Sequence, residues 1–99
     1  MEMNELQKNL LDMVNRIDKK EGVNHNDELT LMHLTEEFGE VSREIINPKL
    51  KRGDINIKNL QEEIADVIIL ISKLANNHNI NIEEAIKNKM IQLKERHNL

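Results

Sequence analysis

The chain lacks several residue types, and each absence removes a class of function. None of its 99 residues is cysteine, which excludes disulfide bonds and thiolate metal sites. Tryptophan and tyrosine are absent and Phe38 is the single phenylalanine, so the aromatic base-stacking surface of single-strand nucleic-acid binders is not available. The longest apolar run, from Val67 to Ile71, is far too short to span a bilayer.

The net charge and the length further restrict the possible functions and the domain organisation. The formal net charge of −4 disfavours a general nucleic-acid or membrane-surface role. The first residues lack a basic segment followed by an apolar one, so a signal peptide is not expected and a cytoplasmic location is. We expect one domain over residues 1–99, with a modest core that association between copies would enlarge.

Apolar residues recur at helical spacing throughout, and no run alternates as a strand would, so an all-α fold is predicted. The expected helices cover about residues 4–19, 26–46, 57–76 and 82 onward. Short connections predict an antiparallel, four-helix bundle-like arrangement. The centre of the third helix, residues 67–71, is apolar on all sides and is expected to be the most buried element.

Local signals set the helix boundaries. Asn26 or Asp27 is suited to cap the second helix, and Pro48 is expected to end it near Ile46. Asn81 begins the last helix with a capping box completed by Glu84. The connection 47–56 is basic, and it is interpreted as a plain surface loop or as a phosphate clamp formed by Lys49, Lys51 and Arg52.

The first helix predicts self-association. Its apolar stripe is wider than packing against one face of a small bundle requires, so we expect a homodimer or a dimer of dimers. The residues of this stripe and its margin are Leu6, Leu10, Leu11, Met13, Val14 and Ile17.

One acidic pattern occurs twice, 26 residues apart, as LTEEFGEVSREI from Leu34 and LQEEIADVIILI from Leu60. On a helix, Glu37 and Glu40 lie roughly 70° and 130° to one side of the apolar stripe, and Glu63 and Asp66 lie similarly beside theirs. Packing of the two stripes would bring both acid pairs to one edge of the contact. A solvated acidic surface is the alternative, but such surfaces usually carry lysine or arginine four residues on, and these acids are followed by further acids.

Carboxylate ligands without cysteine suit hard cations such as Mg²⁺, Mn²⁺ or Ca²⁺. Mg²⁺ typically takes a few carboxylates and completes its shell with water and substrate phosphates. His33 lies one turn before Glu37, where it could pair with that acid, touch a base or lie on the helix surface.

The two acidic motifs resemble those of the MazG-like all-α nucleoside triphosphate pyrophosphohydrolases. That family has EExxE followed by ExxD, matched here by Glu36-Glu37-Phe38-Gly39-Glu40, then 22 residues, then Glu63-Ile64-Ala65-Asp66. The resemblance covers about residues 29–96. It implies a hydrolase that uses Mg²⁺, with Mn²⁺ as a substitute, to cleave a (d)NTP into a (d)NMP and pyrophosphate.

The resemblance also implies roles for particular residues. The metal ligands would be Glu37, Glu40, Glu63 and Asp66. Of the remaining motif acids, either Glu36 or Glu62 could orient a ligand or a water, and Glu36 is the candidate to assist the attacking water. Lys89 and Arg96, with Lys94 nearby, match basic residues that contact the substrate phosphates. Many relatives carry asparagine where this chain has Leu93, which leaves part of the phosphate or sugar contact in doubt.

Two other functions stay open at this point. The chain could resemble phosphoribosyl-ATP pyrophosphohydrolase, an enzyme of the same superfamily with equivalent chemistry. It could also be a non-catalytic helical interaction module, with the acids serving solubility.

Overall fold

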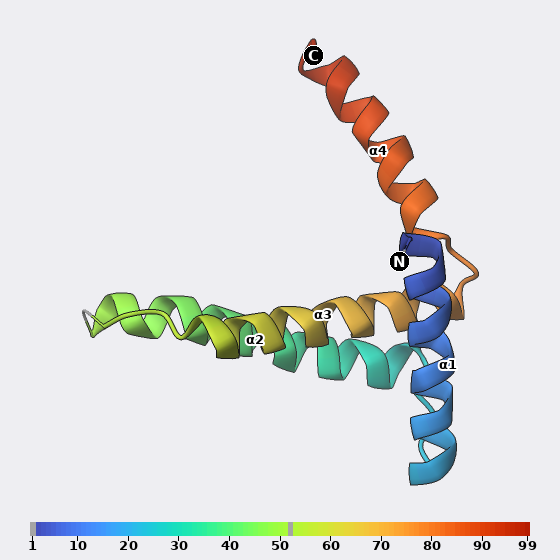
Figure 1. The fold of residues 1–99 in the computed structure, drawn as a ribbon, viewed down its shortest axis with the longest axis horizontal. Coiled ribbons are helices and arrows are strands. Elements are labelled where there is room, and N and C mark those ends of the chain that lie inside the picture. The colour runs from blue at the N-terminus through green and yellow to red at the C-terminus, as the bar shows by residue number, and fades with distance from the viewer. Residues whose placement is uncertain (1, 52) are drawn as a thin grey trace.

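The computed structural model describes residues 2–51 and 53–99, and most of them are helical (Figure 1). The helices are α1 (Met3–Glu21), α2 (Asp27–Leu50), α3 (Ile57–Asn77) and α4 (Ile82–Arg96). The prediction of an all-α fold is confirmed, and the described residues contain no strand. No helix in this described part is both long and apolar enough to cross a membrane.

Asparagine side chains cap the N-termini of three of the four helices. Each amide oxygen accepts the backbone N–H of the residue three positions on, which satisfies a donor that the helix itself leaves unpaired. The pairs are Asn26 with Leu29 at 2.9 Å, Asn56 with Asn59 at 3.1 Å and Asn81 with Glu84 at 2.9 Å. Gly22 ends α1 at a φ of 67°, in the left-handed region that glycine adopts without strain.

The end of α2 was predicted wrongly. The helix continues through Pro48 to Leu50, four residues beyond the expected end at Ile46. Because Pro48 lies in the last turn, its missing N–H removes one bond at the frayed end of the helix and does not break its interior. Lys51 N–H donates to the Asn47 carbonyl at 3.0 Å and Gly53 N–H donates to the Pro48 carbonyl at 2.7 Å, so the chain leaves the helix with these carbonyls paired.

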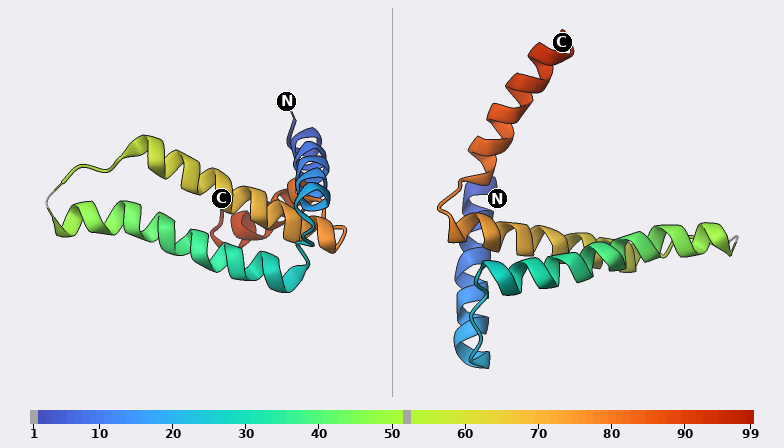
Figure 2. Two further views of the ribbon diagram at one scale, coloured as in Figure 1. Left: turned by 90° about the horizontal axis from the view of Figure 1, so that it is seen from below. Right: turned by 180° about the vertical axis from the view of Figure 1, so that it is seen from behind.

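The helices form an open arrangement in a single chain. Helices α2 and α3 lie antiparallel and side by side, and α1 crosses the end of this hairpin where α2 begins and α3 ends (Figures 1 and 2). Helix α4 contacts mainly α1 and contains no buried residue. The Cα radius of gyration is 16.3 Å, above the ~13 Å of a compact 100-residue domain. One chain therefore supplies an antiparallel helix pair and two further helices that do not close a bundle around it.

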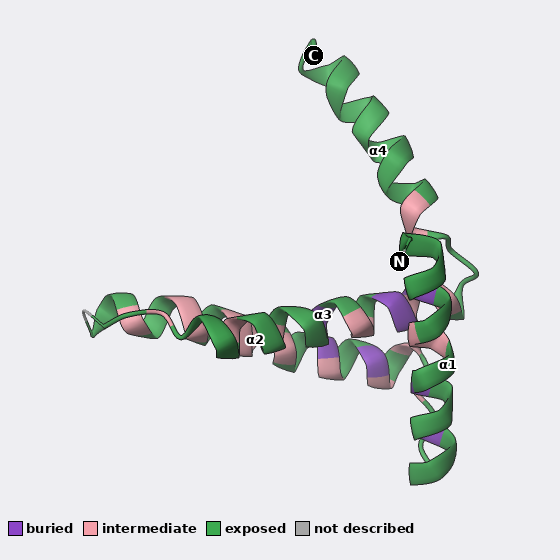
Figure 3. Ribbon diagram, in the orientation of Figure 1, coloured by how far each residue is buried: buried purple, intermediate pink, exposed green. Residues whose placement is uncertain are grey.

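The core is small and extends from the crossing of α1 into the α2–α3 contact (Figure 3). Its buried apolar residues are Val14, Leu34, Val67 and Ala75. The centre of α3 is not the most buried element, contrary to the sequence-based expectation. Val67 is 9% exposed, but Ile68 is 50% and Ile71 is 40% exposed, because α2 covers only one side of α3 at this point.

Helix α1 packs through a mixed polar face. The residues it buries are Gln7, Val14 and Asp18, whereas Leu6 and Ile17 from the predicted apolar stripe are 45% and 48% exposed. Helix α1 is thus rotated so that a mixed polar face, and not its apolar stripe, contacts the other helices. Polar partners on the other elements explain this rotation. The Gln7 amide Nε2 donates to Asn76 Oδ1 at 3.0 Å and to the Ile80 carbonyl at 2.7 Å, and Gln7 Oε1 accepts from the Ile82 N–H at 2.9 Å.

Replacement of Gln7 by alanine should destabilise the chain by about 2 kcal/mol, because three hydrogen bonds are lost and buried partners are left unpaired. Urea unfolding at constant protein concentration measures this change. Gln61→Ala removes an exposed glutamine and should stay within about 0.5 kcal/mol of the original protein. Equal effects of the two substitutions would contradict a role for Gln7 in holding α1 to the α3–α4 turn.

Candidate metal centre

The packing of α2 on α3 brings carboxylates from both helices together. Leu34 and Val67 are buried in this contact, while Phe38 is 50% and Ile64 is 43% exposed at the other margin of the two apolar stripes. The helices therefore meet closer to their acidic sides than to the stripe centres. Carboxylate oxygens of Glu37, Glu63 and Asp66 all lie within 4.8 Å of one another.

The cluster concentrates negative charge in a partly shielded place. Glu37 and Glu63 are half-buried, and Glu37 Oε2 is buried without a hydrogen-bond partner among the described residues. A hydrogen bond with Glu37, burial, and the charges of Glu37, Glu40 and Asp66 together raise the pKa of Glu63.

An unpaired buried carboxylate oxygen beside two further carboxylates is a donor set that fits a hard divalent cation. The same set without a cation keeps like charges close together.

Two predicted motif residues lie apart from this group. The Glu40 carboxylate accepts a hydrogen bond from Arg43 one turn further along α2, and its charge still acts on Glu63. Glu36 is exposed and points away from the α2–α3 contact by its helical position. A fourth ligand at Glu40 and a water-assisting role for Glu36 stay predictions.

The predicted substrate-binding residues Lys89, Lys94 and Arg96 are exposed on α4. This helix projects away from the α2–α3 hairpin, so one chain does not bring these cations to the carboxylates (Figure 1). Of the predicted phosphate clamp, Lys49 is exposed in the last turn of α2, and Lys51 is exposed directly after the helix ends at Leu50. Arg52 lies outside the described residues.

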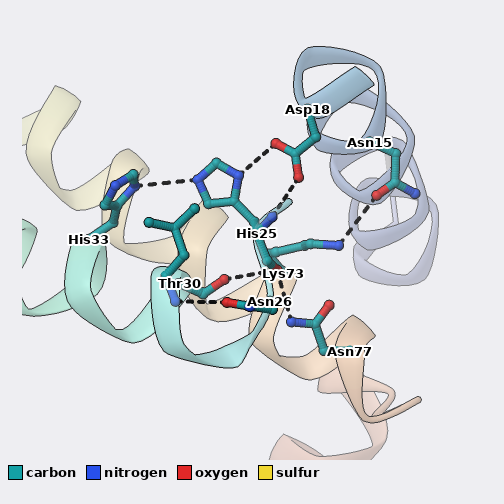
Figure 4. Close-up of polar contacts among 9 residues, drawn as sticks. Asn15, Asp18, His25, Asn26, Thr30, His33, Lys73 and Asn77 are labelled. Atoms are coloured by element: carbon teal, nitrogen blue, oxygen red, sulfur yellow. Dashed lines mark hydrogen bonds and ion pairs between the residues drawn. The ribbon is translucent and has the colours of Figure 1, made fainter. Parts of the chain in front are cut away.

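A second polar group, not expected from the sequence, joins α1 to α2. Asp18, His25 and His33 form a continuous line of hydrogen bonds from the end of α1, through the connecting loop, to α2 (Figure 4). Because Gly22 ends α1 between Asp18 and His25, no helical spacing relates these residues in the sequence. Of this group, helical periodicity predicted only that His33 lies one turn before Glu37.

Comparison with known proteins gives consistent matches. The family described as the MazG nucleotide pyrophosphohydrolase domain matches residues 25–99. An uncharacterized protein, YpjD of Bacillus subtilis (strain 168), is 40% identical over 58 residues, which are 56% of this chain and 52% of that protein. The chain therefore matches about half the length of this relative. No solved structure matches the chain.

The raised pKa of Glu63 predicts a pH-dependent stability of the metal-free protein. The folded state holds this proton more tightly than the unfolded chain, so the stabilising contribution is complete below the ordinary value of 4.5 and is lost as the pH rises through the folded-state pKa. Glu63→Gln should therefore melt at a higher temperature than the original protein at pH 7 in a chelator, and at nearly the same temperature at pH 4.

Glu62→Gln is the matched control, because Glu62 is the exposed neighbour of Glu63 on the same helix. It should change the melting temperature less at pH 7. Thermal unfolding followed by circular dichroism across pH 4–8 decides the matter, and a loss of stability in metal-free Glu63→Gln at pH 7 would contradict the repulsive cluster.

Proposed function

This chain belongs to the MazG nucleotide pyrophosphohydrolase family, and we propose that it is an enzyme that hydrolyses a (d)NTP to a (d)NMP and pyrophosphate. Cleavage between the α- and β-phosphates follows from that activity. The proposal takes Mg²⁺ as the cofactor, with Mn²⁺ as a substitute, and a nucleotide as the substrate. It also places the protein in the cytoplasm, with residues 1–99 acting as one domain.

The observation that carries this proposal is the convergence of Glu37, Glu63 and Asp66 from two helices, with one buried oxygen unpaired. Members of the family are generally metal-dependent, which agrees with such a donor set. When bound, the ion supplies charge neutralisation at the phosphates and a lowered pKa of coordinated water. Glu40 would join the ligands by exchanging Arg43 for the ion.

The residues around the cluster would bind and orient the substrate. Glu36 would accept a hydrogen bond from the attacking water, and Lys89, Lys94 and Arg96 would neutralise phosphate oxygens. Since α4 of the same chain projects away from the carboxylates, the contribution of these cations requires α4 from another copy. The proposed function thus includes assembly.

We propose that a second copy covers the hairpin apolar face, defined as Leu31, Phe38, Ile64, Ile68 and Ile71. These residues are 40–50% exposed and lie on the side of α2 and α3 opposite the carboxylates. Isologous packing of two such faces places four helices in one bundle, which a single chain does not form. A homodimer is the minimal assembly, and the exposed α1 stripe offers a surface for a dimer of dimers.

Pyrophosphate release from a panel of NTPs and dNTPs with Mg²⁺ or Mn²⁺ tests the activity directly. We expect Glu63→Ala to lower kcat/KM by more than about 100-fold, because it removes a ligand oxygen at the centre of the cluster. Glu5→Ala, at an exposed position in the first turn of α1, is the matched control and should keep full activity.

Absence of pyrophosphate release with every nucleotide of the panel would overturn the assignment. Release from phosphoribosyl-ATP alone would instead identify the related enzyme of the same superfamily. Thermal unfolding separates a metalloenzyme from an interaction module. Mg²⁺ at 100 times its Kd adds about 2.7 kcal/mol to the original protein, or about 10 °C or more, and should add nothing to Glu63→Gln.

The assembly is tested by placing a charge in the hairpin apolar face. Ile68→Glu would put an unpaired carboxylate into the buried centre of the proposed interface, which strongly disfavours association. We expect light scattering at micromolar concentration to report at least a dimer for the original protein and a monomer for Ile68→Glu. Asn88→Glu, on the polar side of α4, should leave the mass unchanged, and a monomeric original protein would refute the interface.

A further inference from the structure

The line of hydrogen bonds from Asp18 to His33 begins at a carboxylate with two donors (Figure 4). Asp18 is 8% exposed. Its Oδ2 accepts the His25 backbone N–H at 2.9 Å, and its Oδ1 lies 2.6 Å from His25 Nδ1. Burial raises the pKa of Asp18, but the two hydrogen bonds from His25 and the charges of His25 and Lys73 together lower the pKa overall. The ionised carboxylate can only accept, so the proton of the short contact resides on His25 Nδ1.

This proton fixes the tautomers of both histidines. In the tautomer that carries its proton on Nδ1, His25 presents a lone pair on Nε2, which lies 3.3 Å from His33 Nδ1. His33 must then donate through Nδ1–H, and its own Nε2 carries a lone pair. Asp18 thereby determines the hydrogen-bonding character of a ring atom two residues further along the line.

His33 lies one helical turn from the carboxylate cluster. His33 precedes Glu37 by one turn of α2, on the same face, a displacement of about 5.4 Å along the helix. Its ring is half-buried, and Nε2 has no hydrogen-bond partner among the described residues. A ligand with its phosphates at the cluster has two possible orientations along α2. Its nucleoside lies either within reach of His33 Nε2 or in the opposite direction, toward the α2–α3 loop.

The lone pair on His33 Nε2 can accept a hydrogen bond only from a part of the nucleotide that carries a donor. Phosphate oxygens at neutral pH are acceptors and cannot donate to His33 Nε2, whereas the nucleoside carries donors. On the basis of the proposed function, we propose that His33 is a specificity-determining residue that accepts a hydrogen bond from the nucleoside. The donor would be an exocyclic amino group of the base or a hydroxyl of the sugar. Asp18 and His25 are positioning residues that keep Nε2 an acceptor.

Nucleotides that differ in an exocyclic group of the base or in a sugar hydroxyl test the proposal. CTP against UTP and ATP against ITP exchange an amino group for a carbonyl, and ribo-, deoxy- and dideoxynucleotides remove the sugar hydroxyls in turn. We expect one of these series to show a preference for the donor of about 3- to 10-fold in kcat/KM, the value of one hydrogen bond. His33→Leu should abolish that preference, and an unchanged preference in His33→Leu would overturn the proposal.

Asp18→Asn gives a result that a merely structural role would not produce. The His25 backbone N–H still requires an acceptor, so the new amide oxygen faces it and the amide NH₂ faces His25 Nδ1. His25 Nδ1 must then accept, its Nε2–H donates to His33, and His33 Nε2 becomes a donor. For the amino–carbonyl pairs the preference should reverse toward UTP and ITP. For the sugar series it should persist, because a hydroxyl can accept from Nε2–H as well as donate to Nε2. A folded Asp18→Asn that kept the original amino–carbonyl preference would overturn the positioning role.

Asp27→Asn is the matched control, because Asp27 Oδ2 contacts His78 Nε2 at 2.7 Å in a second aspartate–histidine pair outside this line. Its donor preference should equal that of the original protein. If Asp18→Asn does not fold, the tautomer of His33 in the wild-type protein still tests the relay. Long-range ¹H–¹⁵N spectra should show His33 protonated at Nδ1 at pH 8, and protonation at Nε2 would overturn the relay.

Equilibrium binding separates this proposal from the proposed function. Kd values for the same nucleotide pairs, measured with Ca²⁺ to retain the substrate, report the donor preference without turnover. Binding with the expected preference but without pyrophosphate release under Mg²⁺ would remove the proposed reaction and support the role of His33. Release without any donor preference would support the reaction and overturn the role of His33.

Discussion

Contact between the apolar stripes of α2 and α3 holds carboxylates together against their mutual repulsion, and the candidate site depends on this balance. The oxygens of Glu37, Glu63 and Asp66 lie within 4.8 Å of one another only because Leu34 and Val67 pack between the helices on the same side. Apolar burial supplies the attraction, while the raised pKa of Glu63 records the electrostatic cost. A divalent cation would convert that cost into binding energy, which links the fold to the proposed chemistry.

The rest of the chain is organised around the end of this hairpin by polar contacts as much as by a core. Gln7 ties α1 to the α3–α4 turn, and Asp18 ties it to the loop before α2. Side-chain hydrogen bonds are directional, so they fix the crossing of α1 more sharply than a small apolar contact would. This explains why the apolar stripe of α1 faces outward and why so much apolar surface is left exposed in a single chain.

Charge is distributed unevenly along the hairpin, so the two ends of the candidate site differ in their chemistry. Glu40 and Glu44 continue the acidic side toward the α2–α3 loop, whereas His33, His25 and the nearly buried Lys73 lie toward α1. Lys73 donates to Asn15 at 3.3 Å and lowers the pKa of Asp18 through its charge. The metal-binding and nucleoside-binding functions proposed for α2 therefore occupy successive turns of one helix, with different chemistry on each.

The sequence by itself determined the helices, most of their caps and the sidedness of the acids, because periodicity and capping act over three to four residues. It also predicted that Glu37 and Glu63 would share one edge, since each lies at the same angle from an apolar stripe. It could not determine the outward rotation of α1 or the separation of α4 from the carboxylates. Those features, and the line from Asp18 to His33, depend on contacts between residues that no helical spacing relates, so only the tertiary structure decided them.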